Sequence, residues 1–402
     1  IKFVEYYLVT TSDERTWPKN SPILFLGEWC LKNSRKKYWQ KLEYKVNKPI
    51  FLDQISREKK QKVVFNYIKI FLPLISESLN NTHNVKFSSR YWNILVGPWL
   101  HRIISTFFNR YYALRYAIEN HKITGTTIIK PKNHNLFTND TLSFIYSTND
   151  QLWNNVLYGK ILEHLEDPEI KLNYLTLEEE EEEYFFFNDN NIKKNFIKKI
   201  IKSLAHKISS ILTKKSDALI IGSYLSLYDE IKLNVLLKQF PKFYKNESIK
   251  FNKYQQRHYK YLENNFSSDN FYNFINKNLI SFLPSIFYED YKVLRNISKN
   301  LPWPEKPKFI FTSNNCDTDE IFKAWTAEKC EEGIKYFVGQ HGNNYGQHFY
   351  LGNLSWPERS TPDGFITWGW SDKNFNTIKG FNFKKSFFTL RYSKSFFINF
   401  FS

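Results

Sequence analysis

The chain of 402 residues is long enough for about two domains, or for one large domain with insertions. Its 42% hydrophobic, 18% aromatic and 24% charged residues exclude an intrinsically disordered chain and indicate a globular protein with an aromatic core. The net charge of +17 is compatible with binding of a nucleic acid, an anionic membrane surface or an acidic substrate, and equally with a lysine-rich solvated surface.

Short apolar runs bounded by turn residues predict the buried strands of a parallel sheet. They are Ile23–Gly27, Ala218–Gly222, Phe309–Thr312, Tyr336–Gly339 and Phe365–Trp368. Apolar residues at spacings of three and four predict helices at Val63–Ser78, Tyr91–Ile118, Gln151–Leu165 and Asp319–Glu332. For the last helix, Asp317 or Thr318 is the expected N-cap and Gly333 the expected stop. The pattern as a whole predicts an α/β fold with a Rossmann-like parallel sheet and large helical insertions.

The order of these elements predicts one Rossmann-like, acceptor-side domain over residues 1–375, with helical insertions at about 60–210 and 225–300. Residues 376–402 are aromatic and basic and lack a helix stop or a turn signal, so we interpret them as the partial or atypical start of a missing second domain. No segment has the roughly 20 uninterrupted apolar residues that a membrane-spanning helix needs. The three cysteines form no CxxC pair, which favours a reducing compartment over a disulfide framework or a structural zinc site.

Two neighbouring segments carry strong charge of opposite sign. The six glutamates of Glu178–Glu183 repel one another and predict an exposed loop or helix end. The lysine-rich segment Ile192–Ile208 predicts an amphipathic helix. This helix is either an ordinary surface helix or one that docks on an anionic bilayer.

The segment Phe309–Gly346 predicts a βαβ unit with polar residues at the end of each strand. Because parallel strands end at the same edge of a sheet, we expect Asp319 and His341 to face one crevice. A glycine-flanked histidine suits acid–base chemistry or phosphate binding, and a carboxylate suits base or nucleophile chemistry in sugar transfer. The alternative for Asp317 and Asp319 is helix capping, and the spacing does not decide whether Asp317, Asp319 or Glu320 is catalytic.

Further side chains are candidates for the same chemistry. Glu28 comes directly after a predicted strand, at the same kind of strand-end position as His341, and is the third catalytic candidate. Candidate substrate-binding residues are Gln340, Gly342, Asn343, Glu320, Arg90 and Ser313. Arg90 lies in a stretch of basic and aromatic residues that suits a sugar ring with an acidic group, or a buried helix with a capped end.

Several well-known motifs do not occur in the sequence. GxxxxGK[ST], GxGxxG, HExxH and GxSxG are missing, so phosphate-loop, dinucleotide, zincin and serine-hydrolase chemistry lack support. No paired DxD indicates a metal-dependent sugar-nucleotide site. We therefore expect a mechanism without metal or cofactor.

Seven blocks of the sequence are distinctive and run along most of the chain. They are YLVTTSDERTWP, ILFLGEWC, RYWNILVGPWL, NDQLWNNVLYGKIL, TDEIFKAW, GQHGNNYG and FITWGWSDK. Together these blocks resemble a family of transferases encoded in bacterial O-antigen and surface-carbohydrate loci. More remotely, the arrangement is similar to retaining Kdo transferases, which have the two-domain GT-B fold and use a CMP-activated ulosonic acid. This resemblance implies Asp319 as nucleophile, His341 as its assistant, Glu28 in acceptor activation, and a cytidine nucleotide bound mainly by the second domain.

The resemblance thus implies a glycosyltransferase of surface-polysaccharide biosynthesis, with a nucleotide sugar as donor substrate and a glycan or lipid-linked glycan as acceptor. We expect it in the cytoplasm, peripheral to the inner face of the plasma membrane, without a specific nucleic-acid partner. Three alternatives stay open. They are an inverting polyol-phosphate or sialic-type transferase with His341 as base, a truncated inactive remnant, and a basic nucleic-acid-binding protein.

Overall fold

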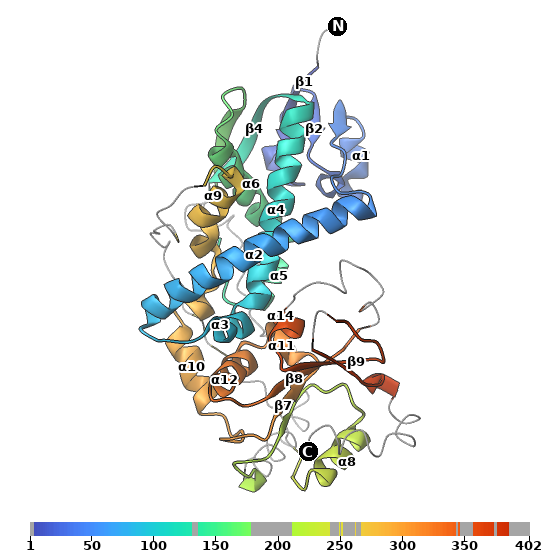
Figure 1. The fold of residues 1–402 in the computed structure, drawn as a ribbon. Helices are drawn as coiled ribbons and strands as arrows, with labels where there is room; N and C mark the ends of the chain where they lie inside the picture. The colour runs from blue at the N-terminus through green and yellow to red at the C-terminus, as the bar shows by residue number, and fades with distance from the viewer. Residues whose placement is uncertain are drawn as a thin grey trace. The chain divides into compact units, whose positions relative to one another are not determined.

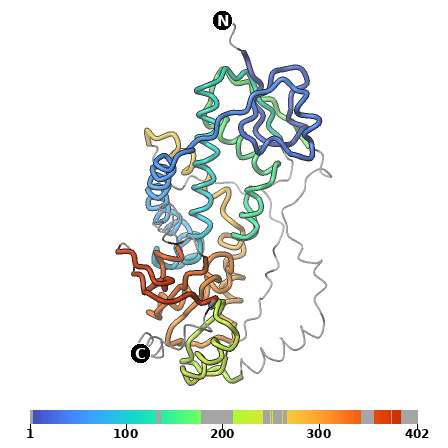
Figure 2. Tube along the Cα trace, turned by 90° about the vertical axis from the view of Figure 1, so that its right-hand side faces the viewer, coloured from blue at the N-terminus to red at the C-terminus, as the bar shows by residue number. Residues whose placement is uncertain are grey.

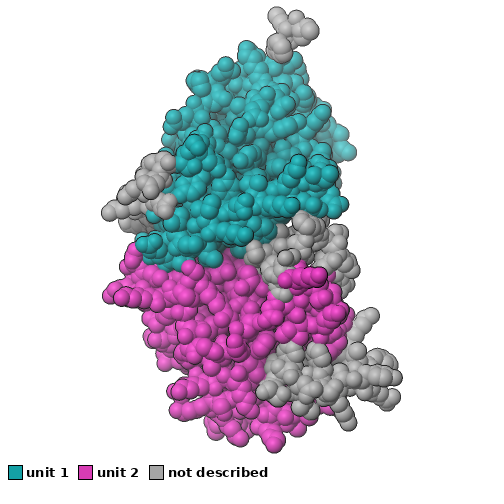
Figure 3. Space-filling view, in the orientation of Figure 1, with its two compact units in different colours: residues 1–78, 99–187, 251–288 teal, residues 79–98, 188–250, 289–402 magenta. Residues whose placement is uncertain are grey.

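The structure, a computed structural model, divides the chain into two compact units with a sheet each (Figure 3). It describes residues 4–130, 136–177, 211–241, 249, 251, 262, 267–342, 345, 357–373 and 376–385. Unit 1 comprises residues 1–78, 99–187 and 251–288, and unit 2 comprises residues 79–98, 188–250 and 289–402. The predicted α/β class with parallel Rossmann-like sheets is confirmed. We expected one sheet over residues 1–375, however, and the structure has two sheets in that range.

The sheet of unit 1 has the strand order β3-β2-β1-β4-β5, and all its strands are parallel. The strands are β1 (Glu5–Val9), β2 (Ile23–Phe25), β3 (Tyr44–Val46), β4 (Lys122–Lys130) and β5 (Lys171–Thr176). The dark blue N-terminal strands lie beside the later strand β4, because β1 pairs with β2 on one side and with β4 on the other (Figure 2). This is the strand order of a Rossmann sheet, in which ligands bind where the order reverses.

Six described α-helices that range from one turn to 30 residues accompany the sheet of unit 1, and α2 and α4 are the longest of them (Figure 1). They are α1 (Lys36–Trp39), α2 (Gln54–His83), α4 (Gly97–Asn120), α5 (Thr141–Ser147), α6 (Gln151–Leu165) and α9 (Asn270–Asn278). Helix α6 approaches β4 so closely that a Cβ on Gly159 would lie 2.5 Å from Cγ2 of Ile128. The ring of Phe107 on α4 packs edge-on against Phe274 of α9, with 5.1 Å between centroids. Aromatic contacts of this kind form much of the core of unit 1.

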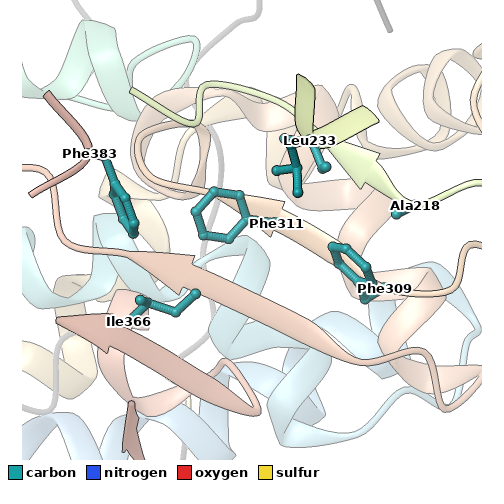
Figure 4. Close-up of a cluster of buried hydrophobic side chains, with 7 residues drawn as sticks. Ala218, Leu233, Phe309, Phe311, Ile366 and Phe383 are labelled. Atoms are coloured by element: carbon teal, nitrogen blue, oxygen red, sulfur yellow. The ribbon is translucent and has the colours of Figure 1, made fainter. Parts of the chain in front are cut away.

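The sheet of unit 2 has the order β10-β9-β8-β7-β6, so its strands follow one another in chain order. The strands are β6 (Leu219–Ile220), β7 (Ile310–Thr312), β8 (Tyr336–Gly339), β9 (Gly364–Thr367) and β10 (Thr377–Lys379). The helices are α3 (Ser89–Leu95), α8 (Leu227–Leu236), α10 (Tyr291–Lys299), α11 (Asn315–Thr318), α12 (Glu320–Glu331) and α14 (Pro357–Ser360). One face of this sheet is buried in a cluster with Leu233, Phe311, Ile366 and Phe383 (Figure 4).

Strand β10 lies within residues 376–402, which we interpreted from the sequence as the partial or atypical start of a second domain. Residues 377–379 pair in parallel with β9, so these three residues belong to the sheet of unit 2. Residues 386–402 lie outside the described part of the chain, as do the charged segments Glu178–Glu183 and Ile192–Ile208.

The five predicted strands are confirmed, as β2 and β6 to β9. The predicted helix Tyr91–Ile118 is two helices, α3 and α4, because Pro98 lacks a backbone N–H and its ring clashes with the preceding turn. Gly333 ends α12 with φ +86°, as expected, but the N-cap is Asp319 and not Asp317 or Thr318. None of the described helices combines the length and the apolar character that crossing a membrane requires.

Candidate functional site

The loops that follow the strands of unit 2 meet at the carboxyl edge of its sheet. Ser313 follows β7, and its backbone N–H donates to the Gly222 carbonyl oxygen at 2.9 Å, while its hydroxyl donates to the Ser223 carbonyl oxygen at 3.2 Å. The turn that begins at Gly339 follows the neighbouring strand β8. The sequence prediction that the loops after these two strands share one edge is therefore confirmed.

Gly339 leaves no room for a side chain at the start of this turn. A Cβ there would lie 2.5 Å from the Ser313 hydroxyl oxygen and 2.6 Å from the ring of Phe383. Real Cβ atoms do not approach other atoms this closely, so only glycine lets β8 pass between the two side chains.

The side chain of Gln340 fixes the shape of the turn. It is 2% exposed, and its Nε2 donates to the Gly342 carbonyl oxygen at 2.7 Å. Its Oε1 accepts hydrogen bonds from the backbone N–H of Trp368 at 2.9 Å and from Nε1 of Trp370 at 2.7 Å. Because a buried amide must be satisfied, these bonds join the turn to the loop after β9. Gln340 thus positions the next residue, His341.

His341 lies beside a carboxylate that the sequence analysis did not single out, that of Glu358 on α14. Nδ1 of His341 is 3.7 Å from Oε2 of Glu358, and the two side chains are 31% and 18% exposed. The hydroxyl of Tyr345 donates to Oε1 of Glu358 at 2.6 Å and lies 3.3 and 3.2 Å from Nδ1 and Nε2 of His341. The Tyr345 oxygen can also accept from an imidazole N–H, so the three side chains form a His–Tyr–Glu relay.

The relay lies in surroundings of negative charge and partial burial. Burial and the carboxylate of Glu358, with a further contribution from Asp317, raise the pKa of the Tyr345 hydroxyl above its usual range. The tyrosine therefore stays a neutral hydroxyl and acts as a hydrogen-bond donor and acceptor. Asp317 belongs to α11, which packs against α14. Of the three acidic candidates from the sequence, the structure brings Asp317 into the electrostatic surroundings of this relay.

The short helix α14 is held in place by the residue after Glu358. The side chain of Arg359 is fully buried, and its Nη2 is 2.9 Å from Oδ2 of Asp372. Its guanidinium lies 5.3 Å from the ring centroid of Trp370, which is itself bonded to Gln340. A planar guanidinium suits such a combined ion pair and ring contact. The loop after β9 therefore supports both the histidine turn and the carboxylate of Glu358.

Tyr224 borders the relay in a strained backbone conformation. Its φ of 60° lies in the left-handed region, which is unfavourable for a bulky side chain. Its ring is stacked at 17° to that of His341, with 6.4 Å between centroids, and the side chain is 38% exposed. The ammonium of Lys384 lies 4.8 Å from the centroid of the same tyrosine ring. Strained residues of this kind gather at binding sites, where the surrounding structure holds them.

The other two acidic candidates from the sequence, Asp319 and Glu320, both contact residues near the start of α12. Oδ1 of Asp319 accepts from the backbone N–H of Phe322 at 3.0 Å, and Oδ2 accepts from Nδ2 of Asn315 at 2.7 Å, so Asp319 caps α12. Glu320 is 5% exposed and forms an ion pair of 2.8 Å with the fully buried Lys323. Both carboxylates therefore have structural contacts at the start of α12.

The remaining candidates are Arg90, Glu28 and Asn343. Arg90 pairs with Asp363 at 2.9 Å, and Asp363 accepts from the backbone N–H of Tyr336, the first residue of β8. Arg90 is thus at the amino edge of the sheet, opposite the histidine turn. Glu28 belongs to unit 1, where it follows β2 and is exposed. Asn343 lies outside the described residues.

Chemically, the site combines an accessible imidazole with a carboxylate and a hydroxyl that orient it, at the edge where open α/β sheets bind ligands. Among the described residues, no three His, Cys, Asp or Glu side chains gather as metal ligands do. The sequence analysis missed Glu358 and Tyr345. For Tyr345 the available signal was its position four residues after His341, whereas the sequence around Glu358 gives no such signal.

The comparison with known proteins agrees with a transferase. The sequence profile of the LIC12162 family transferases matches residues 6–394, which is nearly the whole chain. No curated protein and no solved structure matches the chain. The match includes both sheets and the complete His341 turn, and the chain therefore belongs to the LIC12162 family of transferases.

Proposed function

We propose that the chain is a glycosyltransferase of bacterial surface-polysaccharide assembly that uses His341 as its general base. The observation that carries this proposal is the His341–Tyr345–Glu358 relay at the carboxyl edge of a parallel sheet. Membership in a transferase family and two Rossmann-like sheets, the domain content of GT-B enzymes, support it. The donor would be a nucleotide sugar, with a CMP-linked ulosonic acid as the first choice, and the acceptor a glycan or lipid-linked glycan.

In the proposed reaction, an imidazole nitrogen of His341 takes the proton of an acceptor hydroxyl as its oxygen bonds to the anomeric carbon. The bond from that carbon to the nucleotide phosphate breaks, and the nucleotide leaves with the electron pair. Glu358 stabilises the imidazolium that forms, and Tyr345 holds the ring in position by its hydrogen bonds. This direct displacement inverts the anomeric configuration.

The alternative is a retaining reaction with Asp319 as nucleophile, as the remote resemblance to Kdo transferases implies. Its weakness is that both carboxylate oxygens of Asp319 already accept hydrogen bonds, one of them as the cap of α12. A nucleophile needs an oxygen that is free to reach the anomeric carbon. The inverting reaction with His341 is therefore the better supported of the two.

The test is incubation of the protein with CMP-linked ulosonic acids and with UDP- and GDP-linked sugars, with release of the free nucleotide as the readout. We expect one donor to be consumed, and His341→Ala to lower the rate at least about 100-fold, as is usual for loss of a general base. Consumption of no donor, or an unchanged rate for His341→Ala, refutes the proposal. A sugar trapped covalently on Asp319 supports the retaining alternative.

A further inference from the structure

A cluster of cations lies in unit 1, where helix α2 meets helix α4 (Figure 1). The ammonium of Lys60 on α2 donates a hydrogen bond to Oδ1 of Asn109 on α4. Arg110 follows Asn109 on α4. Arg57 is three residues before Lys60 on α2, and side chains at this spacing are neighbours on the surface of a helix. We call Arg57, Lys60 and Arg110 the Lys60 cluster.

The hydrogen bonds of the cluster lead to neutral oxygens. Nε of Arg57 donates to the carbonyl oxygen of Phe51 at 3.0 Å. Nε and Nη2 of Arg110 donate to Oδ1 of Asn154, each at 3.2 Å, and Nη2 also donates to the carbonyl oxygen of Thr148 at 3.3 Å. Within the described ranges, none of the three cations forms an ion pair. Because an ammonium has three N–H donors and a guanidinium has five, each group also keeps donors for a further partner.

Carboxylates near the cluster in the sequence, or near its hydrogen-bond partners, accept hydrogen bonds within their own segments. Oδ1 of Asp53 accepts from the backbone N–H of Ser56 at 2.8 Å. Oε1 of Glu58 accepts from Nε2 of Gln54 at 2.9 Å. Asp150 accepts from a backbone N–H of α6 at 2.7 Å, as the N-cap of that helix. These carboxylates therefore do not neutralise the cluster by direct pairing.

The electrostatic balance at Lys60 is positive. Burial, followed by the guanidinium groups of Arg110 and Arg57, lowers the pKa of the Lys60 ammonium to about 8. Among the described residues, no carboxylate counteracts this shift. A negative charge within about 4–6 Å would raise the pKa of the lysine and offset the repulsion between the cations. The arrangement therefore calls for an anionic ligand.

Exposed apolar side chains adjoin the cluster at the start of α2. The Lys60 ammonium lies 5.3 Å from the ring centroid of Phe51, whose carbonyl oxygen bonds to Arg57. Leu52 and Ile55, which lie between Phe51 and Arg57 in the sequence, are 64% and 66% exposed. Basic residues beside exposed leucine and isoleucine are typical of surfaces that contact lipids. A lipid headgroup is therefore one source of the anion, and an anion free in solution is the other.

We propose that the Lys60 cluster binds a phosphate group, which is either free or part of a lipid headgroup. A phosphate has several oxygens that accept charge-assisted hydrogen bonds, so one group can engage the ammonium and both guanidinium groups. The proposal accounts for the gathering of three cations whose hydrogen bonds all lead to neutral oxygens. It goes beyond the proposed function, since the cluster lies in unit 1 and its ligand takes no part in the proton transfer at His341.

The test for free phosphate is calorimetric titration of the whole protein with inorganic phosphate and with pyrophosphate. We expect saturable binding of at least one of them, and Lys60→Met should weaken it at least about 10-fold through the loss of a charge-assisted hydrogen bond. Lys59→Met is the matched control, because it removes the same charge from the neighbouring, exposed position of α2 and should change the affinity less than about 2-fold. Arg57→Met replaces an exposed side chain and should weaken binding at least about 5-fold, which keeps the proposal testable if Lys60→Met does not fold.

The test for a lipid phosphate is co-sedimentation with phosphatidylcholine vesicles that contain or lack phosphatidic acid. Preference for phosphatidic acid that is lost in Lys60→Met and kept in Lys59→Met identifies a lipid ligand, whereas binding in the titration without this preference identifies a free one. His341→Ala should bind as the unaltered protein does even though transfer is lost, so failure of the proposed function leaves this result unchanged. Absence of binding in both assays, or equal losses for Lys60→Met and Lys59→Met, overturns the proposal.

Discussion

Replacing Glu358 by glutamine tests the role of the carboxylate beside His341 with the smallest change of shape. Glutamine keeps an oxygen that can accept from Tyr345 but removes the negative charge 3.7 Å from Nδ1 of His341. Two unit charges about 4 Å apart interact by about 4 kcal/mol at an effective dielectric of 20 and by about 1 kcal/mol in water. Because the two side chains are 31% and 18% exposed, we expect a value toward the lower limit, about 1–2 kcal/mol.

In the proposed reaction, this energy acts on the imidazolium of His341, which forms only as the acceptor proton is transferred. The rate of sugar transfer should therefore fall about 5- to 30-fold in Glu358→Gln, while the KM for the donor changes little. The assay is nucleotide release at saturating donor over a range of acceptor concentrations. Glu332→Gln is the matched control, since Glu332 pairs with Lys329 on the surface of the same unit. Equal rates for Glu358→Gln and the unaltered protein, with intact folding, would refute the role of the carboxylate.

Three further predictions concern the fold around the two sheets. Gly159→Ala should lower the free energy of unfolding by about 1–3 kcal/mol, despite alanine's better helix propensity, because its Cβ collides with Ile128. In the Ile128→Ala background this collision is absent, so Gly159→Ala should cost much less there. Urea titrations of both single variants and the double variant measure the difference. Burial raises the pKa of the Glu230 carboxyl, so the stability that its neutral form contributes is present below the unfolded pKa and is lost as the pH rises through the folded pKa. The change in the free energy of unfolding caused by Glu230→Gln should thus be more favourable at pH 7.5 than at pH 4. An equal change at both pH values contradicts this assignment. Gly339→Ala should lower transfer more than it lowers the unfolding midpoint, since the added Cβ displaces the histidine turn, and unchanged transfer contradicts the steric argument.

Much of unit 2 could be predicted because its strands are continuous apolar runs. Runs such as Ile310–Thr312 and Tyr336–Gly339 are covered on both faces of the sheet, which produces an unmistakable pattern in the sequence. The parallel order of these two strands then placed Ser313 and His341 at one edge, as observed. Local residue patterns were sufficient here, because the elements that form this edge are close together in the sequence.

Most of the sheet of unit 1 escaped prediction for the opposite reason. β4 is KITGTTIIK, with glycine and three threonines, and its exposed and buried positions are mixed. β1 carries Glu5 and two tyrosines, and only its last two residues are buried. Neither segment has the continuous apolar pattern of a buried strand. In the sequence, the long helices α2 and α4 lie between β2 and β4. A pairing over such a distance depends on the tertiary fold, which local propensity does not determine.

Glu358 was missed for a related reason, since its role arises only from tertiary contacts. Nothing in the sequence Pro357–Ser360 distinguishes this carboxylate from a surface residue at a short helix start. Its place beside His341 depends on the buried Arg359, which pairs with Asp372 after the next strand. Asp319, by contrast, was weighed as both cap and catalyst, and only the coordinates of its two oxygens favour the cap.

The two sheets also differ in their strand order, and this difference affects the space between the loops at the carboxyl edge of each sheet. In unit 1 the strand order reverses at β1, and a cavity of about 630 Å³ lies at this reversal, where the loops after adjoining strands separate. In unit 2 the strands follow in chain order without a reversal, so the loops at the carboxyl edge lie side by side and bond to one another through Gln340 and Ser313. A packed edge of this kind suits the fixed positioning of a side chain, and an open one leaves more room for a ligand. On this argument, a variant of the His341 relay such as His341→Ala should lower kcat with little change in the KM for the acceptor.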